Sequence, residues 1–389
     1  MNIRDLMLSL IRSAIKGEPL SEDVKKDLNT EKLAKLYSVS SSHDISHIIA
    51  VALEKDGLLL NDKASQDFIL KKEQAKIRCG LIDSELTEIQ TLFDKNDIDY
   101  IKLKGAQIRS YYPQKWYRTS CDLDILVKEE QLEKAKNLLI KEKQYKLMRE
   151  KGFHDVSLMS PFGVHLELHY NIKEGISSYD SVLERVWEYS KKDTDSSNMY
   201  TQSNEFLMFY CISHTAYHFI GGGCGIRAIL DFWILLKSLS LDYDLLTSLL
   251  NEAGLLVFYE AVRKLANQWF DCIKADDGTI DEMEKFVILG GTYGSRSQSI
   301  SHSKAGNENK ATYLRKRLFM SYDSLSMLYP IIKKYKILTP FYQIKRWFGM
   351  IFKKEKISNE LKRISKNSEE INEIREMLCN LELVERKQK

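Results

Sequence analysis

The segment RTSCDLDILV, residues 118–127, restricts what this chain can fold into more than any other feature. Its apolar residues alternate and β-branched residues close it, a pattern that predicts a β-strand. Asp122 and Asp124 are two residues apart, so both carboxylates lie on one face of that strand, with Cα atoms about 6–7 Å apart. Like charges at that distance raise each other's pKa unless a positive charge lies between them. A divalent cation supplies such a charge, and Mg²⁺ prefers a few carboxylates completed by water and phosphate oxygens.

A third acid follows in VHLELHYNI, residues 164–172. Strand alternation places His165, Glu167 and His169 on the polar face and leaves the apolar residues on the other. If this strand pairs with residues 121–127, three carboxylates converge on one spot and have enough oxygen atoms to hold two metal ions. The alternative is an edge strand whose polar face is solvated, because short acidic motifs often have no ligand.

The segment YIKLKGAQIRS precedes the acidic strand. It predicts a strand over residues 99–105, a tight turn at Gly105 and a short helix after the turn. Free backbone N–H groups at the start of a helix favour phosphate. Lys104 adds positive charge beside the turn, and the guanidinium of Arg118 is suited to bidentate phosphate binding. A phosphate site beside the two acids is therefore expected.

Hydrophobic periodicity divides the chain into four parts. The helical period predicts helices through residues 1–95 and again through residues 179–330. Residues 96–178 change to short strands around one amphipathic helix, and residues 331–389 predict a basic amphipathic helical tail. The expected fold class is α+β, a small mixed-sheet core flanked by N-terminal and C-terminal helical regions.

Composition limits the class of protein further. The formal net charge of +3 over 389 residues is too small to indicate nucleic-acid binding. The six cysteines include no CxxC pair, which argues against a disulfide framework or a cysteine-based zinc site and favours a reducing compartment. Charges interrupt the apolar N-terminal segment, so it predicts an amphipathic helix and not a signal peptide. We expect a cytoplasmic protein.

Several segments resemble a known family. Gly105, the Asp122-Leu123-Asp124 strand and the later Glu167 resemble the nucleotidyltransferase superfamily, which has the polymerase-β-like fold. LKGAQIRSYYP, YRTSCDLDILV, HLELHYNI, LMFYCISHTAYHF and GIRAILDFWILL are more closely similar to the branch called the uncharacterised nucleotidyltransferase family. The resemblance implies transfer of a nucleoside monophosphate from an NTP donor to a hydroxyl acceptor, with release of pyrophosphate.

The resemblance also implies roles for particular residues. By position, Asp122, Asp124 and Glu167 would be the catalytic carboxylates and would bind Mg²⁺, or Mn²⁺ in its place. Glu167 would also help to deprotonate the acceptor. The phosphate groups of the nucleotide would be bound by residues near the turn. These residues are Lys104, Gly105 and Arg118.

One departure from the superfamily pattern keeps an alternative open. The superfamily has Ser after the Gly where this chain has Ala106, so a hydroxyl contact to phosphate is missing. The alternative is a non-catalytic protein that uses the same fold to bind a nucleotide or a partner. The intact set of three acids favours the enzyme. Its acceptor, whether a sugar, a small metabolite or a protein hydroxyl, is not indicated by any motif.

Two pairs of histidines accompany these residues. His165 and His169 flank Glu167 and are expected to tune that carboxylate, to contact substrate or to serve the structure alone. His214 and His218 are four residues apart on a predicted helix, a spacing that permits metal binding. Their segment lacks the Glu of the zinc-protease motif HExxH, so hydrogen bonding or packing around the site is the favoured reading.

Arg227 and Asp231 are also four residues apart on a predicted helix. A surface salt bridge between them is the simplest interpretation. The family pattern, which includes an Arg-x-x-x-Asp helix, adds a second interpretation in which they face substrate or pack between domains.

The tail segment IIKKYKILTPFYQIKRWFGMIFKKEKI, residues 331–357, interleaves basic and aromatic side chains. A basic amphipathic helix can lie on an anionic membrane surface or bind nucleic acid, which would suit a membrane- or RNA-associated scaffold. The favoured interpretation is that the aromatic side chains pack on the body of the protein while the lysines are solvated.

Overall fold

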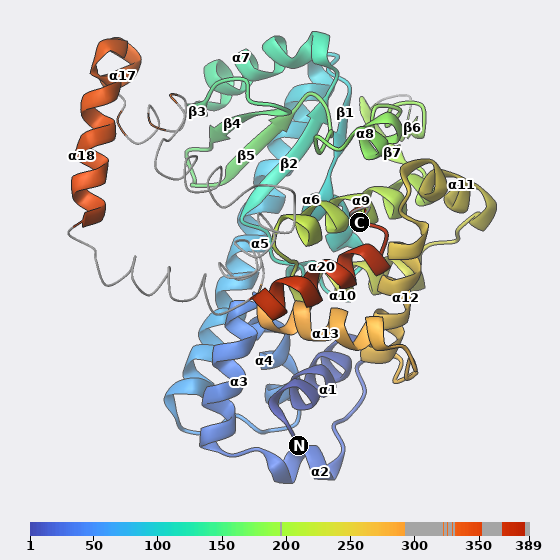
Figure 1. The fold of residues 1–389 in the computed structure, drawn as a ribbon. Helices are drawn as coiled ribbons and strands as arrows, with labels where there is room; N and C mark the ends of the chain where they lie inside the picture. The colour runs from blue at the N-terminus through green and yellow to red at the C-terminus, as the bar shows by residue number, and fades with distance from the viewer. Residues whose placement is uncertain are drawn as a thin grey trace.

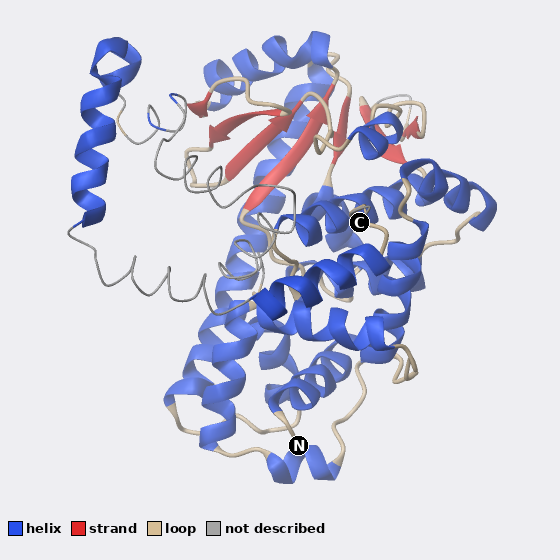
Figure 2. Ribbon diagram, in the orientation of Figure 1, coloured by secondary structure: helices blue, strands red, loops and turns tan. Residues whose placement is uncertain are grey.

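A mixed β-sheet and a larger body of helices make up the fold (Figures 1 and 2). The computed structural model describes residues 1–194, 197–291, 322, 325, 329, 331–351 and 368–385. Within these residues the sheet has seven strands in the order β3-β4-β5-β2-β1-β7-β6, which confirms the α+β fold class. The strands are β1 Tyr100–Lys102, β2 Asp122–Val127, β3 Lys146–Arg149, β4 Asp155–Met159, β5 His165–His169, β6 Ser190–Lys192 and β7 Met199–Gln202.

Strand β2 lies between β5 and β1, and its pairing decides which polar side chains meet. β2 and β5 run parallel, and their register pairs Asp122 with His165 and Asp124 with Glu167. β1 is antiparallel to β2, and β4 is antiparallel to β5. The pairing on which convergence of the three acids depends is therefore present, and the three acids lie on neighbouring strands.

The two faces of β2 pack against different parts of the molecule. Leu123, Ile125 and Val127 are buried against helices α5 (Lys63–Lys95) and α7 (Leu132–Lys143). Asp122 and Asp124 point to the opposite face because side chains alternate along a strand. The apolar residues thus hold β2 in place while the acids face away from that core.

The remaining helices come from both ends of the chain. In chain order they are α1 Ile3–Lys16, α2 Glu22–Asp27, α3 Thr30–Ser42, α4 Ser46–Lys55, α6 Lys104–Ile108, α8 Ser177–Leu183, α9 Asn204–Gly221, α10 Ile226–Ser238, α11 Tyr243–Ala253, α12 Leu256–Phe270, α13 Gly278–Gly290, α17 Ile331–Lys334, α18 Thr339–Ile351 and α20 Ser368–Asn380. Buried side chains of α1 and α4 belong to the same hydrophobic cluster as those of α9, α10, α12 and α13. Two helical regions that the sheet separates in sequence therefore form one body (Figure 1).

Helix α5 connects this helical body to the sheet. Its 33 residues extend for about 50 Å at 1.5 Å per residue. The Asp62 side chain accepts a hydrogen bond from the backbone N–H of Ser65, which caps the first turn. Phe68, near the start, packs in the helical cluster, while Phe93, near the end, packs under the sheet. One helix thus contributes to both cores.

Two local predictions were wrong. The turn after β1 lies at Lys104, whose φ is 43°, and Gly105 is already inside α6. Residues near 190–202 contain the short strands β6 and β7, where the sequence predicts helices only. Strands of three and four residues are too short to show an alternating pattern, and pairing of β7 with β1 forms them.

The predicted tail lies partly outside the described residues. Helices α17 and α18 are described and lie apart from the helical body in Figure 1. Ile337 and Phe341 are exposed, so the expected packing of tail side chains on the body is not observed at these two positions. Helix α20 does pack on α13 and buries Met377 and Leu378.

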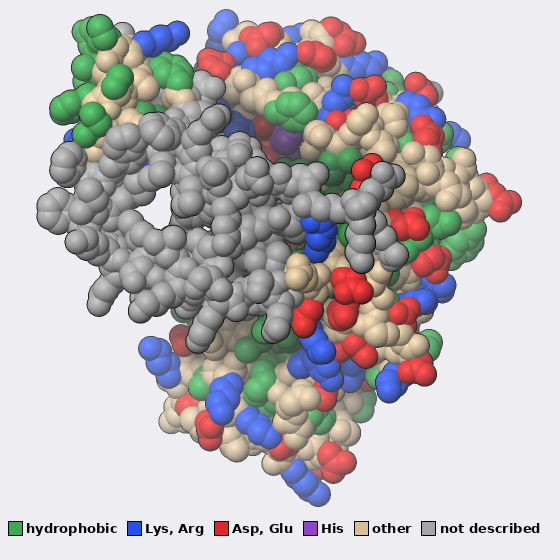
Figure 3. All heavy atoms as spheres, in the orientation of Figure 1, with side chains coloured by type: hydrophobic (Ala, Val, Ile, Leu, Met, Phe, Trp, Pro, Cys, Tyr) green, Lys and Arg blue, Asp and Glu red, His purple; other side chains and the backbone are tan. Residues whose placement is uncertain are grey.

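Two further observations concern the distribution of charge on the surface and the length and apolar character of the helices. On the face drawn in Figure 3, basic and acidic side chains are interspersed over the helical body. Among the described residues, no helix has both the length and the apolar character needed to cross a bilayer.

The packing beneath the acidic strands yields a stability prediction. Leu166 on β5 is fully buried in the cluster under the sheet, whereas Leu289 on α13 is 74% exposed. Leu166→Ala is expected to lower the free energy of unfolding by about 2–5 kcal/mol, because it leaves a cavity. The matched change Leu289→Ala is expected to stay within about 0.5 kcal/mol of the unaltered protein. Urea unfolding measures both, and equal effects would contradict the assigned core.

Candidate active site

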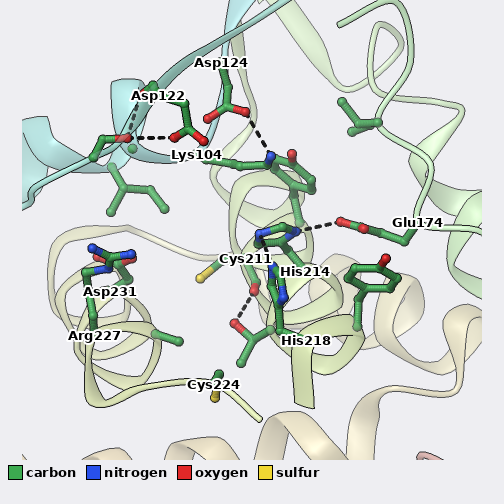
Figure 4. Close-up of a pocket in the computed structure, with 18 of the residues that line it drawn as sticks. Lys104, Asp122, Asp124, Glu174, Cys211, His214, His218, Cys224, Arg227 and Asp231 are labelled. Atoms are coloured by element: carbon green, nitrogen blue, oxygen red, sulfur yellow. Dashed lines mark hydrogen bonds and ion pairs between the residues drawn. The ribbon is translucent and has the colours of Figure 1, made fainter. Parts of the chain in front are cut away.

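A pocket of about 340 Å³ lies between the acidic face of the sheet and helices α9 and α10 (Figure 4). Every site residue proposed from the sequence lines this pocket except His165. The lining residues from that set are Lys104, Gly105, Arg118, Asp122, Asp124, Glu167, His169, His214, His218, Arg227 and Asp231. The fold therefore brings together side chains from segments that are far apart in sequence.

Asp124 is the most enclosed acid of the site, with 2% of its surface exposed. Its Oδ1 accepts hydrogen bonds from Lys104 Nζ and from His169 Nε2, each at 2.9 Å. Burial alone raises the pKa of Asp124, but the charges and hydrogen bonds of Lys104 and His169 outweigh burial and lower it. Asp124 is therefore ionised at neutral pH.

Asp122 has the opposite electrostatic environment. Burial and repulsion from Asp124 and Glu167 raise the pKa of Asp122. The hydroxyl of Ser120 donates to the backbone oxygen of Asp122 at 2.6 Å and lies 3.2 Å from its Oδ1. A bound cation would oppose these effects and favour the charged form of Asp122.

Glu167 is common to two groups of potential metal ligands. Ligand atoms of Asp122, His165 and Glu167 lie within 4.8 Å of one another, and the same holds for Asp124, Glu167 and His169. The close approach of His169, whose Nε2 lies 3.6 Å from Oε2 of Glu167, lowers the pKa of Glu167. Carboxylate oxygens in this number suit Mg²⁺ or Mn²⁺, so the donor set fits the metal that the resemblance implies.

Lys104 is held in an uncommon backbone conformation. Its positive φ of 43° turns the chain sharply after β1, and its ammonium group reaches Asp124. Burial opposes the charge on Lys104, yet attraction to Asp124 raises its pKa well above the usual value. Non-glycine residues in this region of φ and ψ cluster at functional sites, because the surrounding structure must hold them there.

Gly105 is closely packed against Ser120. A Cβ atom at this position would lie 3.0 Å from Ser120 Oγ and 3.2 Å from Ser120 Cβ. A larger residue would require the Ser120 side chain to shift by a few tenths of an ångström. Gly105 therefore lets the Ser120 hydroxyl approach α6 and Asp122 together.

Arg118 and Asp231 form a buried ion pair between the sheet and α10. Arg118 Nε lies 2.9 Å from both carboxylate oxygens of Asp231, and the Tyr112 hydroxyl donates to the same carboxylate at 2.6 Å. Arg227 instead pairs with Asp44 at 2.7 Å. The expected surface bridge between Arg227 and Asp231 is replaced by these two contacts between elements. The guanidinium of Arg118 is already bound to Asp231. Phosphate binding by Arg118 stays a prediction.

His214, His218 and Glu174 form a separate cluster on the helical side of the pocket (Figure 4). His214 Nδ1 lies 2.7 Å from Glu174 Oε1, and its Nε2 lies 3.1 Å from Nε2 of His218. Burial raises the pKa of Glu174, but the hydrogen bond from His214 outweighs it, so the net shift is downward. Burial and the neighbouring His214 lower the pKa of His218 to about 4, so His218 is neutral at neutral pH.

Comparison with known protein families shows which family this chain belongs to. Residues 29–271 match the family described as Uncharacterised nucleotidyltransferase, and this span is more than half of the chain. The chain belongs to the uncharacterised nucleotidyltransferase family. No match was found among curated proteins or among solved structures. Membership in this family supports nucleotidyl transfer as the general role and an NTP as donor.

The family match includes residues in and around the pocket that the sequence did not indicate. Glu174 and Ser120 line the pocket and lie within the matched span, as does Asp44, the partner of Arg227. His154 also lines the pocket within this span, and its ring stacks on His169 with centroids 5.2 Å apart. Glu174 and Asp44 act through partners from distant segments, so no local spacing marks them. Glu174 had one usable signal, since it closely follows the strand that carries Glu167.

The buried ion pair of Arg118 with Asp231 provides a second prediction about stability. Asp231→Ala is expected to lower the free energy of unfolding by about 3–5 kcal/mol, because it leaves the Arg118 charge buried and unpaired. Glu252→Ala removes the exposed pair with Arg185 and is expected to cost less than about 1 kcal/mol. Urea unfolding compares the two.

A double variant separates loss of charge pairing from loss of packing. Arg118→Met with Asp231→Leu removes both charges and is expected to recover much of the lost stability. A double variant no more stable than Asp231→Ala would contradict the assigned role of the pair.

Proposed function

We propose that the protein is a metal-dependent nucleotidyltransferase. It moves a nucleoside monophosphate from an NTP to a hydroxyl group of an acceptor and releases pyrophosphate. The observation that carries this proposal is the register of β2 and β5, which places Asp122, Asp124 and Glu167 together on the face that lines the pocket. Family membership supports the reaction class.

The three acids would hold Mg²⁺, or Mn²⁺ in its place. A bound divalent cation would neutralise the charge of the triphosphate and of the transition state. Lys104 adds a fixed positive charge at the same end of the pocket, and the close packing at Gly105 shapes the neighbouring backbone. These residues would orient the donor with its α-phosphorus toward the acceptor.

Glu167 would receive the proton of the acceptor hydroxyl. Its lowered pKa keeps it ionised at neutral pH, the form that can accept a proton. The acceptor oxygen forms a bond to the α-phosphorus while the bond from that phosphorus to the bridging oxygen breaks. Pyrophosphate leaves with the electron pair, and the hydroxyl proton passes to Glu167.

The pocket volume is consistent with a small-molecule site. A sugar, a small metabolite or the hydroxyl of a protein side chain each fits this chemistry. The second candidate is a non-catalytic protein that binds a nucleotide or a partner on the same fold. The bond from Lys104 to Asp124 favours it, because an ammonium group already neutralises one of the metal-binding acids.

Nucleotide binding tests the proposal without knowledge of the acceptor. One of ATP, GTP, CTP and UTP, at about 100 times its Kd and with Mg²⁺, is expected to stabilise the fold by about 2.7 kcal/mol. The stabilisation is expected to require Mg²⁺ and to disappear in Asp122→Asn/Asp124→Asn, which lacks two of the acids. A thermal-shift measurement of each variant with and without ligand gives the result.

A matched control keeps the same change of charge. Asp23→Asn/Asp276→Asn alters two exposed acids outside the pocket and is expected to respond to the nucleotide like the unaltered protein. Stabilisation by an NTP without Mg²⁺ that persists in Asp122→Asn/Asp124→Asn would favour the non-catalytic nucleotide-binding protein. No stabilisation by any NTP would overturn the enzyme proposal.

A further inference from the structure

The histidine cluster opposite the acids has the geometry of a metal site of a different kind. His214 and His218 lie one turn apart on α9, and their Nε2 atoms face each other at 3.1 Å. Two nitrogen ligands of one tetrahedral ion, each about 2.0–2.1 Å from it, lie roughly 3.3 Å apart. A small opening of the pair would therefore place an ion between the two nitrogens.

The second ring nitrogen of His214 is already fixed. Its Nδ1–H donates to Glu174 at 2.7 Å, so Nε2 is the ring nitrogen that faces His218. Histidines that bind metals almost always donate their other N–H to a carboxylate or carbonyl, which sets the tautomer and raises the basicity of the ring. The Glu174 side chain is largely buried at 8% exposure, so this orientation is held firmly.

The carboxylate of Glu174 beside the pair agrees with a cation at this position, because it would add a negative charge next to the ion. A direct N–H···N hydrogen bond between the two rings gives the same distance, so only a binding measurement separates the two arrangements.

We propose that His214 and His218 bind a divalent transition-metal ion that prefers imidazole, such as Zn²⁺, with Glu174 as the residue that positions His214. Both histidines line the pocket, so the remaining coordination positions of the ion would be open to water or to an oxygen atom of a bound ligand.

The two ends of the pocket would then select different metals. The acid end offers mainly carboxylate oxygens, which suit Mg²⁺ or Mn²⁺, whereas the histidine end offers imidazole nitrogens, which suit Zn²⁺, Co²⁺ or Ni²⁺. The inference concerns metal binding alone and does not depend on nucleotidyl transfer.

Titration with Co²⁺ and Zn²⁺ tests the inference. The full chain carrying Asp122→Asn/Glu167→Gln removes Glu167, the residue common to both groups of acid-end ligands, and keeps the ion pair of Asp124 with Lys104, so that Co²⁺ binding reports on the histidine end. We expect one equivalent of Co²⁺ to produce the visible absorption of a nitrogen-ligated ion, and one equivalent of Zn²⁺ to displace it. Absence of this absorption would overturn the proposal.

Further substitutions in the same background identify the ligands. His214→Ala/His218→Ala is expected to abolish Co²⁺ binding, and His218→Asn, which retains a polar side chain of similar size, is expected to do the same. Glu174→Gln still accepts the bond from Nδ1 and is expected to weaken binding by about 10- to 100-fold. His154→Ala removes another histidine of the pocket and is expected to bind Co²⁺ unchanged.

The pattern across variants decides the outcome. Co²⁺ affinity that is equal in His218→Asn and in the parent would overturn the assignment of the ligands. Unchanged affinity in Glu174→Gln would overturn the positioning role of Glu174. Circular dichroism of each variant without metal shows whether a loss of binding comes from unfolding.

Discussion

The buried carboxylate of Asp124 is the contact on which the arrangement of the pocket depends. It binds Lys104 at the turn after β1 and His169 at the end of β5, so one side chain connects three segments of the core. Leaving a buried charge unpaired costs several kcal/mol, which forces both partners to stay in place. The positive φ of Lys104 is retained because this ion pair needs the ammonium group at Asp124.

Much of the acid end could be predicted from sequence because it depends on short-range rules. Strand alternation places Asp122 and Asp124 on one face and Glu167 on the polar face of a later strand, and parallel pairing of β2 with β5 then brings them together. The ion pairs of Arg118 with Asp231 and of Arg227 with Asp44 could not be predicted in this way, because each joins segments that no local pattern relates. The strands β6 and β7 were missed because they are short and are formed by pairing with β1.

Strands of the sheet form one side of the pocket, and helices form most of the other side. Asp122, Asp124 and Glu167 project from central strands whose opposite face is packed on α5 and α7. Glu174 follows β5, while His214 and His218 come from α9. The ion pair of Arg118 with Asp231 joins these two sides just before β2 begins, so α10 is tied to the segment that leads into the acidic strand.

The shared core of the helical body has a consequence for biosynthesis. The apolar faces of α1 and α4 are covered in part by α9, α10, α12 and α13, and the last of these ends at Gly290. A ribosome adds about 5–20 residues per second, so the N-terminal helices wait for many seconds before their partners emerge. During that interval their apolar side chains are exposed to water and to other nascent chains. The segment that contains α1 and α4 is therefore expected to need chaperone protection during translation, although it is made before the helices that cover it.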